Sequence, residues 1–326
     1  MGIRTIADKA NVSIATVSRV LNNPELVKEH TREKVLKIAQ ELNYQKYNYH
    51  FINSNSNDEI GVVLPDVSNS FFSRILEGIS KKAQELDLPL NLYLTHDSKD
   101  KESDVINKII KRKAKGVILI RAKNEEKSTI KSIQKLNKYK IPFVLVDRDI
   151  TSFDCPGVFL SNASAVYDSI NILLKDGYRK IAIICGPKLS LNSNQRLEGY
   201  KEAFAKNNLE IDENMIFRGD FSLESGMLNT KKILELDELP EVIFSCANQM
   251  TIGCIKAIAE QKLFLGKDIK LFSFNKLDAT NVNNFNIFYV EHPVEYMGER
   301  SVNILKNKFV GTKGLIREIL NYKINY

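Results

Sequence analysis

From Ile60 onwards the chain alternates short apolar runs with amphipathic stretches of helical length, and this pattern constrains the fold more than any other feature. The runs read IGVVLP, PLNLYL, GVILI, PFVLVD, GVFL, KIAIICG, EVIFSC, IKLFSF and NIFYV. Between them lie predicted helices at 71–86, 163–174, 195–205 and 250–261. Continuous apolar strands separated by helices are typical of parallel sheets covered on both faces. The pattern therefore predicts an α/β fold with doubly wound parallel sheets.

Nine such runs are too many for one compact half, so we expect a core of two stacked lobes over 59–326. The segment 149–157, which contains Pro156, is a plausible crossover between them. We place the first lobe at about 59–157 plus 291–310 and the second at about 158–290. Ligands of open α/β sheets bind beyond the carboxyl ends of the strands, so the residues after these runs form a candidate site.

The first 45 residues have a different pattern, which predicts three short helices. Ser13 is a natural N-cap for a second helix that begins at Ile14, and Pro24 follows its end. Thr31 is a good N-cap for a third helix. The apolar residues that predict the first helix are Ile3, Ile6, Ala7 and Ala10. Three helices with a tight turn between the first two predict an all-α helix-turn-helix domain over 1–45.

Charge and composition indicate where a partner binds. Residues 1–50 contain eight Lys and Arg against five Asp and Glu, an excess of +3, and the other residues share the remaining +4 of the net +7. This excess at the N-terminus suits a polyanion such as DNA. The segment 46–58 is polar, rich in Asn and Ser, and is predicted to be a linker.

Several classes of protein are disfavoured by absent signals. The N-terminal MGIRTIADKA lacks the apolar core of a secretory signal, and no apolar run approaches a membrane span, so we expect a cytoplasmic protein without a membrane partner. The sequence shows no phosphate-binding loop, nucleophile elbow or HExxH motif, so we expect no enzyme, cofactor or metal site. The four cysteines show no CxxC pairing and are interpreted as packing thiols. A solute-binding protein is the alternative two-lobed class, but it needs an export signal and no helix-turn-helix.

Five segments, in this order, resemble the LacI/GalR (lac-repressor) family of bacterial regulators. They are VSIATVSRVLN at 12–22, SNSFF at 68–72, IPFVLVDR at 141–148, QRLEGY at 195–200 and PVEYMG at 293–298. The resemblance covers nearly the whole chain. It implies a homodimeric repressor of a carbohydrate or related operon, with a palindromic double-stranded operator. It also implies a periplasmic-binding-protein-like core that senses a small-molecule effector.

The resemblance assigns DNA contacts to the second predicted helix. Ile14 and Ala15, near its N-terminus, are expected to meet thymine methyl groups in the major groove. Arg19 is expected to contact a base, although a phosphate contact is the alternative. Further contacts, mainly hydroxyl groups that approach the DNA backbone, are expected from Ser13, Thr16, Ser18 and Asn22.

In the family the linker forms a hinge helix that inserts an apolar side chain into the minor groove. This linker departs from the family pattern, because Lys46 takes the position of a proline and Asn53 that of the inserted leucine. If a side chain inserts here, we expect it to be Phe51 or Ile52. The alternative is a tether without insertion.

The resemblance also assigns an effector site. Phe71 and Phe221 match aromatic positions that flank the effector, Asp147 matches a residue that accepts from ligand hydroxyls, and Arg196 matches a pocket arginine. Two further arginines stand at predicted strand ends, and two asparagines replace the usual carboxylates; these residues are Arg121, Arg148, Asn248 and Asn275. Missing carboxylates and added arginines favour an anionic effector, such as a sugar acid or sugar phosphate. The alternative is a retuned site for a neutral sugar.

Overall fold

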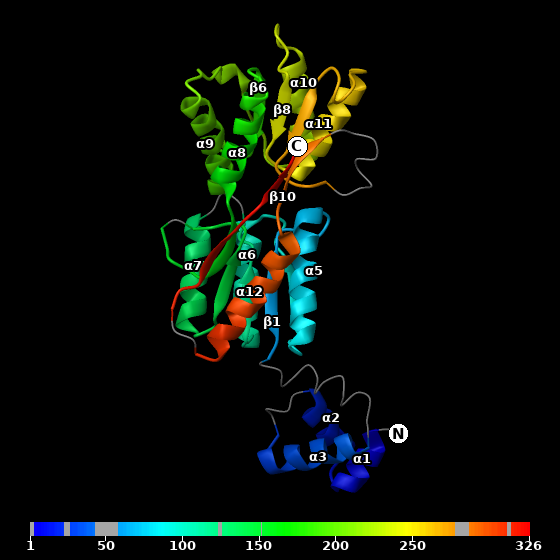
Figure 1. The fold of residues 1–326 in the computed structure, drawn as a ribbon. Helices are drawn as coiled ribbons and strands as arrows, with labels where there is room; N and C mark the ends of the chain where they lie inside the picture. The colour runs from blue at the N-terminus through cyan, green and yellow to red at the C-terminus, as the bar shows by residue number, and fades with distance from the viewer. Residues whose placement is uncertain are drawn as a thin grey trace. The chain divides into compact units, whose positions relative to one another are not determined.

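The structure is a computed structural model that describes residues 3–22, 27–42, 58–122, 126–150, 152–277, 287–311 and 314–326. The chain divides into one unit over 1–58 and a second over 59–326 (Figure 1). Within the described ranges, no helix is both long and apolar enough to cross a bilayer.

The N-terminal unit consists of α1 (Ile3–Ala10), α2 (Ile14–Asn22) and α3 (Glu29–Glu41). The Ser13 hydroxyl accepts a hydrogen bond from the Thr16 amide at 3.0 Å, so Ser13 caps α2 as expected. The small core of the unit comprises Ile6, Ala7, Ala10, Val17, Val20, Val35 and Ala39.

The third helix begins earlier than its sequence predicts. Thr31 is not its N-cap, because α3 already includes Glu29. The amides of Thr31 and Arg32 both donate to the carbonyl of Lys28, so the first helical turn forms on backbone groups without a side-chain cap from Thr31.

The first lobe of the second unit is built on a six-stranded parallel sheet in the order β11-β5-β4-β3-β1-β2. Its strands are β1 (Ile60–Leu64), β2 (Leu90–Leu94), β3 (Gly116–Leu119), β4 (Phe143–Val146), β5 (Gly157–Leu160) and β11 (Arg317–Leu320). Its helices are α5 (Ser70–Glu85), α6 (Lys99–Arg112), α7 (Glu126–Lys138) and α12 (Val294–Phe309). Helices α5 and α12 pack with Val62 and Ile118, whereas α6 and α7 pack with Val63 and Val117, so both faces of the sheet are covered.

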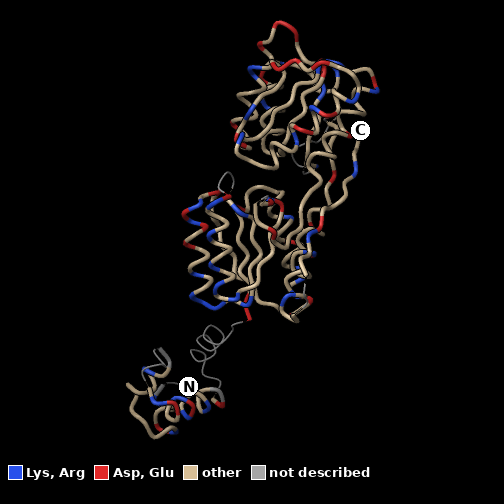
Figure 2. Tube along the Cα trace, turned by 90° about the vertical axis from the view of Figure 1, so that its left-hand side faces the viewer, with Lys and Arg blue, Asp and Glu red and all other residues tan. Residues whose placement is uncertain are grey.

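The second lobe has a six-stranded sheet in the order β12-β10-β9-β8-β6-β7, in which only β12 is antiparallel. Its strands are β6 (Ile181–Cys185), β7 (Ile216–Arg218), β8 (Val242–Ser245), β9 (Lys270–Ser273), β10 (Phe288–Glu291) and β12 (Lys323–Asn325). Its helices are α8 (Asn162–Lys175), α9 (Leu191–Lys206), α10 (Leu223–Leu234) and α11 (Asn248–Glu260), with a 3-10 turn η2 (Glu213–Met215). The central strands of both lobes are almost free of charged residues (Figure 2).

The chain crosses between the lobes after β5, β10 and β11. The second lobe does not begin at 158 as predicted, because β5 lies in the first sheet, where Leu145 of β4 pairs with Gly157. The sequence of a short apolar strand does not indicate which of two sheets the strand joins. The lobe predicted for β5 therefore depended on where the crossover was placed. Figure 1 shows the C-terminal segment, in red, passing from the first lobe to the second.

Glycines set the contacts of the helix pairs that cover the sheets. A Cβ at Gly78 of α5 would lie 1.9 Å from the carbonyl oxygen of Glu295, and one at Gly298 of α12 would lie 2.2 Å from that of Ile75. The α10–α11 pair has the same construction at Gly226 and Gly253. These helices approach so closely that a side chain at the crossing has no room.

Candidate functional site

The outer face of α2 presents apolar and basic side chains together. Val17 and Val20 are buried against the other helices, whereas Ile14 is 43% exposed and Ala15 and Arg19 are also exposed. An exposed isoleucine at a helix N-terminus, with an arginine further along the helix, suits a groove lined by base edges and methyl groups.

The hydroxyl groups near the start of α2 already form hydrogen bonds within the helix and its N-cap. Ser13 and Thr16 share a hydrogen bond of 2.8 Å between their hydroxyls, in addition to the cap that Ser13 provides. Asn22 is the last residue of α2. The predicted inserting residues Phe51 and Ile52 lie outside the described residues.

A cavity of about 440 Å³ is lined by both lobes of the second unit. Loops that follow strands of the first lobe contribute Asp66, Asp97 and Arg148, while α9 contributes Arg196 from the second lobe. Of the predicted effector residues, those that line the cavity are Phe71, Asp147, Arg148, Arg196, Phe221, Asn248 and Asn275. The carboxyl ends of the strands thus converge on one site, as expected for open α/β sheets.

Arg121, which the sequence placed among the effector residues, is not among the residues that line this cavity. Its side chain is buried, and Nε donates to the carbonyl of Asp149 at 2.9 Å, while a terminal nitrogen donates to the carbonyl of Ala122 at 3.2 Å. Burial lowers the pKa of the Arg121 guanidinium, and the nearby Arg148 charge adds to the effect. A position at a strand end does not specify where a long side chain turns, and Arg121 turns beneath the loop that follows β4.

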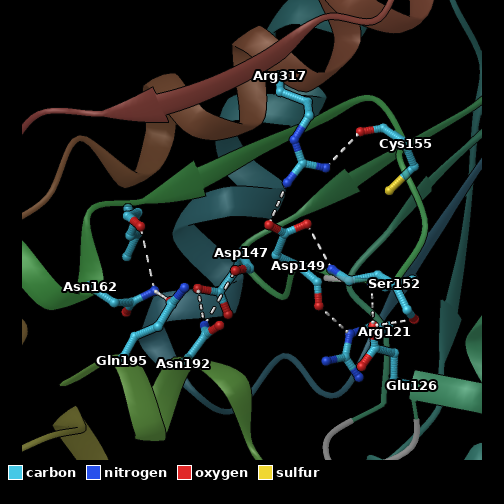
Figure 3. A network of polar contacts seen from close by, with 12 residues as sticks. Arg121, Glu126, Asp147, Asp149, Ser152, Cys155, Asn162, Asn192, Gln195 and Arg317 are labelled. Carbon is cyan, nitrogen blue, oxygen red and sulfur yellow. Dashed lines mark hydrogen bonds and ion pairs between the residues drawn. The ribbon is translucent and has the colours of Figure 1, made fainter. Parts of the chain in front are cut away.

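The network around Arg121 joins this loop to the C-terminal part of the chain. The carboxylate of Asp149 accepts from Arg317 of β11 at 2.5 Å, and Arg317 also donates to the carbonyl of Cys155 at 3.1 Å (Figure 3). Nearby, Ser152 donates to Glu126 through its hydroxyl at 2.9 Å. These contacts hold the loop that carries Asp147 and Arg148 in place.

Arg148 lines the cavity, but its charge already has a partner. Its guanidinium forms an ion pair with Asp97 and donates to the carbonyl of Arg121 at 2.7 Å. It also lies over the ring of Phe72, 5.4 Å from the centroid. The Arg148–Asp97 pair therefore presents little net positive charge to a ligand.

Arg196 is 6% exposed and is held on several sides. Its Nε donates to Asn162 Oδ1 at 2.9 Å, and another nitrogen donates to the carbonyl of Cys246. The guanidinium stacks on Phe274, with Cζ 3.7 Å from the centroid of the ring. Burial lowers its pKa, but a guanidinium remains charged in proteins, so Arg196 is a fixed donor in the cavity wall.

Asp147 is the most buried carboxylate of the cavity lining. It has a φ of 63° and accepts from Asn192 Nδ2 at 3.3 Å through Oδ1 (Figure 3). Burial raises the pKa of the Asp147 carboxyl, while the charges of Arg148 and Arg196 oppose this rise. A left-handed conformation at a non-glycine residue is strained and occurs often at binding sites.

Two aromatic rings line the cavity from different lobes. Phe71 packs edge-to-face against Phe72, with centroids 5.6 Å apart. Phe221 has a φ of 73°, and its ring lies so close to Gly186 that a Cβ there would be 2.1 Å from Cζ. Flat apolar faces beside polar groups are suited to the ring of a sugar or a base.

The cavity contains more carboxylates than its sequence motifs indicate. The acidic lining residues are Asp66, Asp97, Asp147, Asp220 and Glu224, against the two guanidinium groups of Arg148 and Arg196. Sequence reasoning missed Asp97, Asp220 and Glu224 because none follows an apolar run directly. It also missed Asn192, whose position on α9, one helical turn before Arg196, was the available signal.

Two family models match the chain. The one described as bacterial regulatory proteins of the lacI family covers residues 2–46, and the one described as periplasmic binding proteins and sugar binding domain of LacI family covers residues 57–302. Among curated relatives, the regulator RegA of Clostridium acetobutylicum is 31% identical over 93% of this chain and 91% of its own length. Catabolite control protein A of Priestia megaterium is 27% identical over 93% of this chain and 91% of its length.

Solved structures share the fold. A lac repressor dimer bound to operator and the anti-inducer ONPF superposes with a TM-score of 0.75 at 21% identity, covering 99% of this chain and 97% of that one. The regulator CelR in complex with cellobiose gives a TM-score of 0.74 at 21% identity, with 100% and 98% covered. The arrangement of an N-terminal helical unit before a two-lobed core is thus shared over the whole length.

Proposed function

Since the chain belongs to the LacI family of bacterial regulatory proteins, we propose that it represses transcription as a homodimer on a palindromic operator and responds to a neutral, hydroxyl-rich effector. Its curated relatives include transcriptional repressors, and the chain is accordingly a transcription regulator with a DNA-binding unit and an effector-binding core. The operator and the effector class are the parts proposed.

The observation that carries the effector class is the excess of acceptors in the cavity. Five carboxylates face two guanidinium groups, a formal balance of −3 when all are ionised. An anion would meet repulsion from this lining, whereas each ligand hydroxyl can donate to a carboxylate in a charge-assisted hydrogen bond of about 1.5–3 kcal/mol. This supports the neutral alternative over the anionic effector that the sequence favoured.

The two arginines that line the cavity do not favour an anionic effector. Arg148 is paired with Asp97, and Arg196 is bonded to Asn162 and stacked on Phe274. In our proposal Arg196 donates to a ring or hydroxyl oxygen, and Asp147 accepts from a hydroxyl. The rings of Phe71 and Phe221 then contact the apolar faces of the ligand.

On the DNA side, the exposed face of α2 supports base contacts by Ile14, Ala15 and Arg19. One such small unit buries little surface on DNA, so pairing of two units by two-fold symmetry is needed for a specific site. The hydroxyls of Ser13, Thr16 and Ser18, with Asn22, are proposed to contact the backbone. Phe51 or Ile52 remains the proposed minor-groove residue.

Calorimetry on matched ligands tests the effector class. A panel of neutral sugars and nucleosides is first screened by thermal shift, and each hit is then compared with its uronate and phosphate relatives. We expect the neutral member to bind at least about tenfold more tightly, the factor that about 1.4 kcal/mol of charge repulsion produces. Tighter binding of the uronate or phosphate would contradict the proposal.

The variant Arg196→Lys keeps the charge but loses the planar donor. We expect it to bind the neutral ligand less tightly than the parent protein does.

A further inference from the structure

The amide of Asn248 joins the two lobes directly. Asn248 is the first residue of α11 in the second lobe, and its Nδ2 donates to Asn69 Oδ1 at 2.8 Å and to Ser70 Oγ at 3.2 Å. Asn69 and Ser70 stand at the N-terminus of α5 in the first lobe. Asn248 is buried, whereas Asn69 and Ser70 are half-buried.

The orientation of both amides is fixed by backbone groups. Asn69 is the N-cap of α5, and its Oδ1 accepts from the Phe71 amide at 3.1 Å. Asn248 Oδ1 accepts from the amide of Gln249 at 2.9 Å. Neither side-chain amide can turn over without losing its backbone bond. The first lobe therefore presents an acceptor at this contact, and residue 248 must supply a donor.

A second asparagine makes a contact of the same kind. Asn192 on α9 of the second lobe donates through Nδ2 to both Oδ1 and the carbonyl of Asp147 in the first lobe, each at 3.3 Å (Figure 3). Both contacts border the cavity, because all the residues involved except Ser70 line it.

We propose that Asn248 is a positioning residue that holds the lobes closed through its donor to Asn69, so that part of the closure energy comes from the protein itself. Asn248 lines the effector cavity of the proposed function, and this inference rests on that function and deepens it, since the residue also sets the balance between closed and open lobes. A ligand shifts such a balance only by its differential affinity for the two states. The bias from Asn248 therefore limits how much further an effector can close the core.

The Ser70 hydroxyl determines which substitution of Asn248 tests the proposal. Its hydroxyl accepts from Asn248, but a hydroxyl can also donate, so it could bond a carboxylate placed at position 248. The single variant Asn248→Asp would then be partly compensated. The double variant Ser70→Ala/Asn248→Asp removes this compensation and places a carboxylate oxygen against Asn69 Oδ1.

The test measures the distance between the lobes in the full-length protein. Nitroxide labels are attached at Lys101→Cys on α6 and at Leu189→Cys before α9, both exposed positions, while the four native cysteines are buried. Labelled protein is diluted into unlabelled protein, so that electron-electron resonance reads distances within one chain. No ligand or DNA is needed, so failure of this inference is distinguishable from failure of the proposed function.

We expect Ser70→Ala alone to keep the short distance. The double variant should shift the distribution to longer distances, with the ratio of closed to open molecules reduced about fivefold to tenfold, as expected for one lost hydrogen bond. Ser70→Ala/Asn248→Ala, which removes the donor without adding a charge, should shift the population in the same direction and serves if the first double variant does not fold. The matched control Ser70→Ala/Gln249→Glu adds the same charge at the neighbouring residue and should keep the short distance. An unchanged distance in both variants of Asn248, or an equal shift in the Gln249 control, would overturn the inference.

Discussion

Arg19 is the residue on which sequence recognition by the N-terminal unit most depends. It is exposed on α2, on the same helix as the exposed Ile14 and Ala15. Replacing a bidentate base contact costs about 1–3 kcal/mol on the correct sequence and little on random DNA. We therefore expect Arg19→Ala to weaken operator binding by about that amount, measured by fluorescence anisotropy.

The control for this prediction is Arg4→Ala, which removes the same charge from an exposed position of α1. It should weaken operator and scrambled DNA to a similar, small extent. If Arg19→Ala also weakens both DNAs equally, Arg19 contacts only a phosphate and does not read a base.

His292 makes the stability of the core depend on pH. Its ring is buried, Nε2 lies 3.1 Å from the carbonyl of Phe274, and burial together with the nearby Arg196 charge lowers its pKa to about 3. An unfolded histidine binds a proton near pH 6.5. The unfolded chain therefore binds more protons between these values, so stability is lost as pH falls from about 6.5 towards 3.

We expect the free energy of unfolding to fall by about 2 kcal/mol between pH 7 and pH 5 through this group alone. His292→Gln keeps a donor for Phe274 and cannot titrate, so its loss of stability over the same interval should be smaller by that amount. Urea unfolding at the two pH values measures the difference. Equal losses in the two proteins would show that His292 accepts a proton in the fold.

At the level of single residues, the sequence predicted several of the residues that line the cavity. It did not predict the hydrogen bonds that their side chains form. Asp147 and Arg196 lie where their motifs placed them. Arg121 does not, because its direction depends on the carbonyl of Asp149, which no local pattern reveals. Asn248 reaches the cavity, but its bond to Asn69 joins residues far apart in sequence and depends on how the two lobes meet.

The packing of α5 against α12 depends on a glycine at their crossing. A Cβ at Gly78 would lie 1.9 Å from a backbone oxygen, which cannot move aside without shifting α12. In an unobstructed helix, Gly→Ala stabilises by about 0.5–1 kcal/mol. Here we expect Gly78→Ala to destabilise by at least about 2 kcal/mol, because the helices must separate.

Gly61→Ala is the matched control, since a Cβ there meets the Cδ1 atom of Ile109 at 2.8 Å, the flexible end of a side chain. It should cost clearly less than Gly78→Ala in urea unfolding of the full chain. A Gly78→Ala protein as stable as the parent would show that α5 and α12 are not held at this distance.

At the level of elements, the apolar strands were predictable and the polar ones were not. The runs at β1, β3, β6 and β8 are buried along their whole length, so composition alone identifies them. Strands β11 and β12 carry exposed polar residues at the edges of the two sheets and have no such run. Their pairing is determined by neighbouring strands, so a local reading of the sequence misses them.

At the scale of the whole molecule, the proposed function requires that effector binding to the core changes the affinity of the N-terminal unit for DNA. The family assigns DNA to the N-terminal unit and a small molecule to the core. The cavity is lined by both lobes, so an effector bound there would contact both lobes at once. Coupling between two sites of this kind typically changes an affinity 5-fold to 150-fold.

The most direct test is an anisotropy titration of the full-length protein on DNA from upstream of its own coding sequence. It is compared with scrambled DNA of the same composition, with and without the neutral ligand that binds most tightly in calorimetry. We expect at least about 10³-fold tighter binding to the upstream site at physiological salt. We further expect the ligand to change this affinity at least about fivefold while leaving binding to scrambled DNA unchanged. Equal affinity for the two DNAs, or an operator affinity that no cavity ligand alters, would contradict the proposed function.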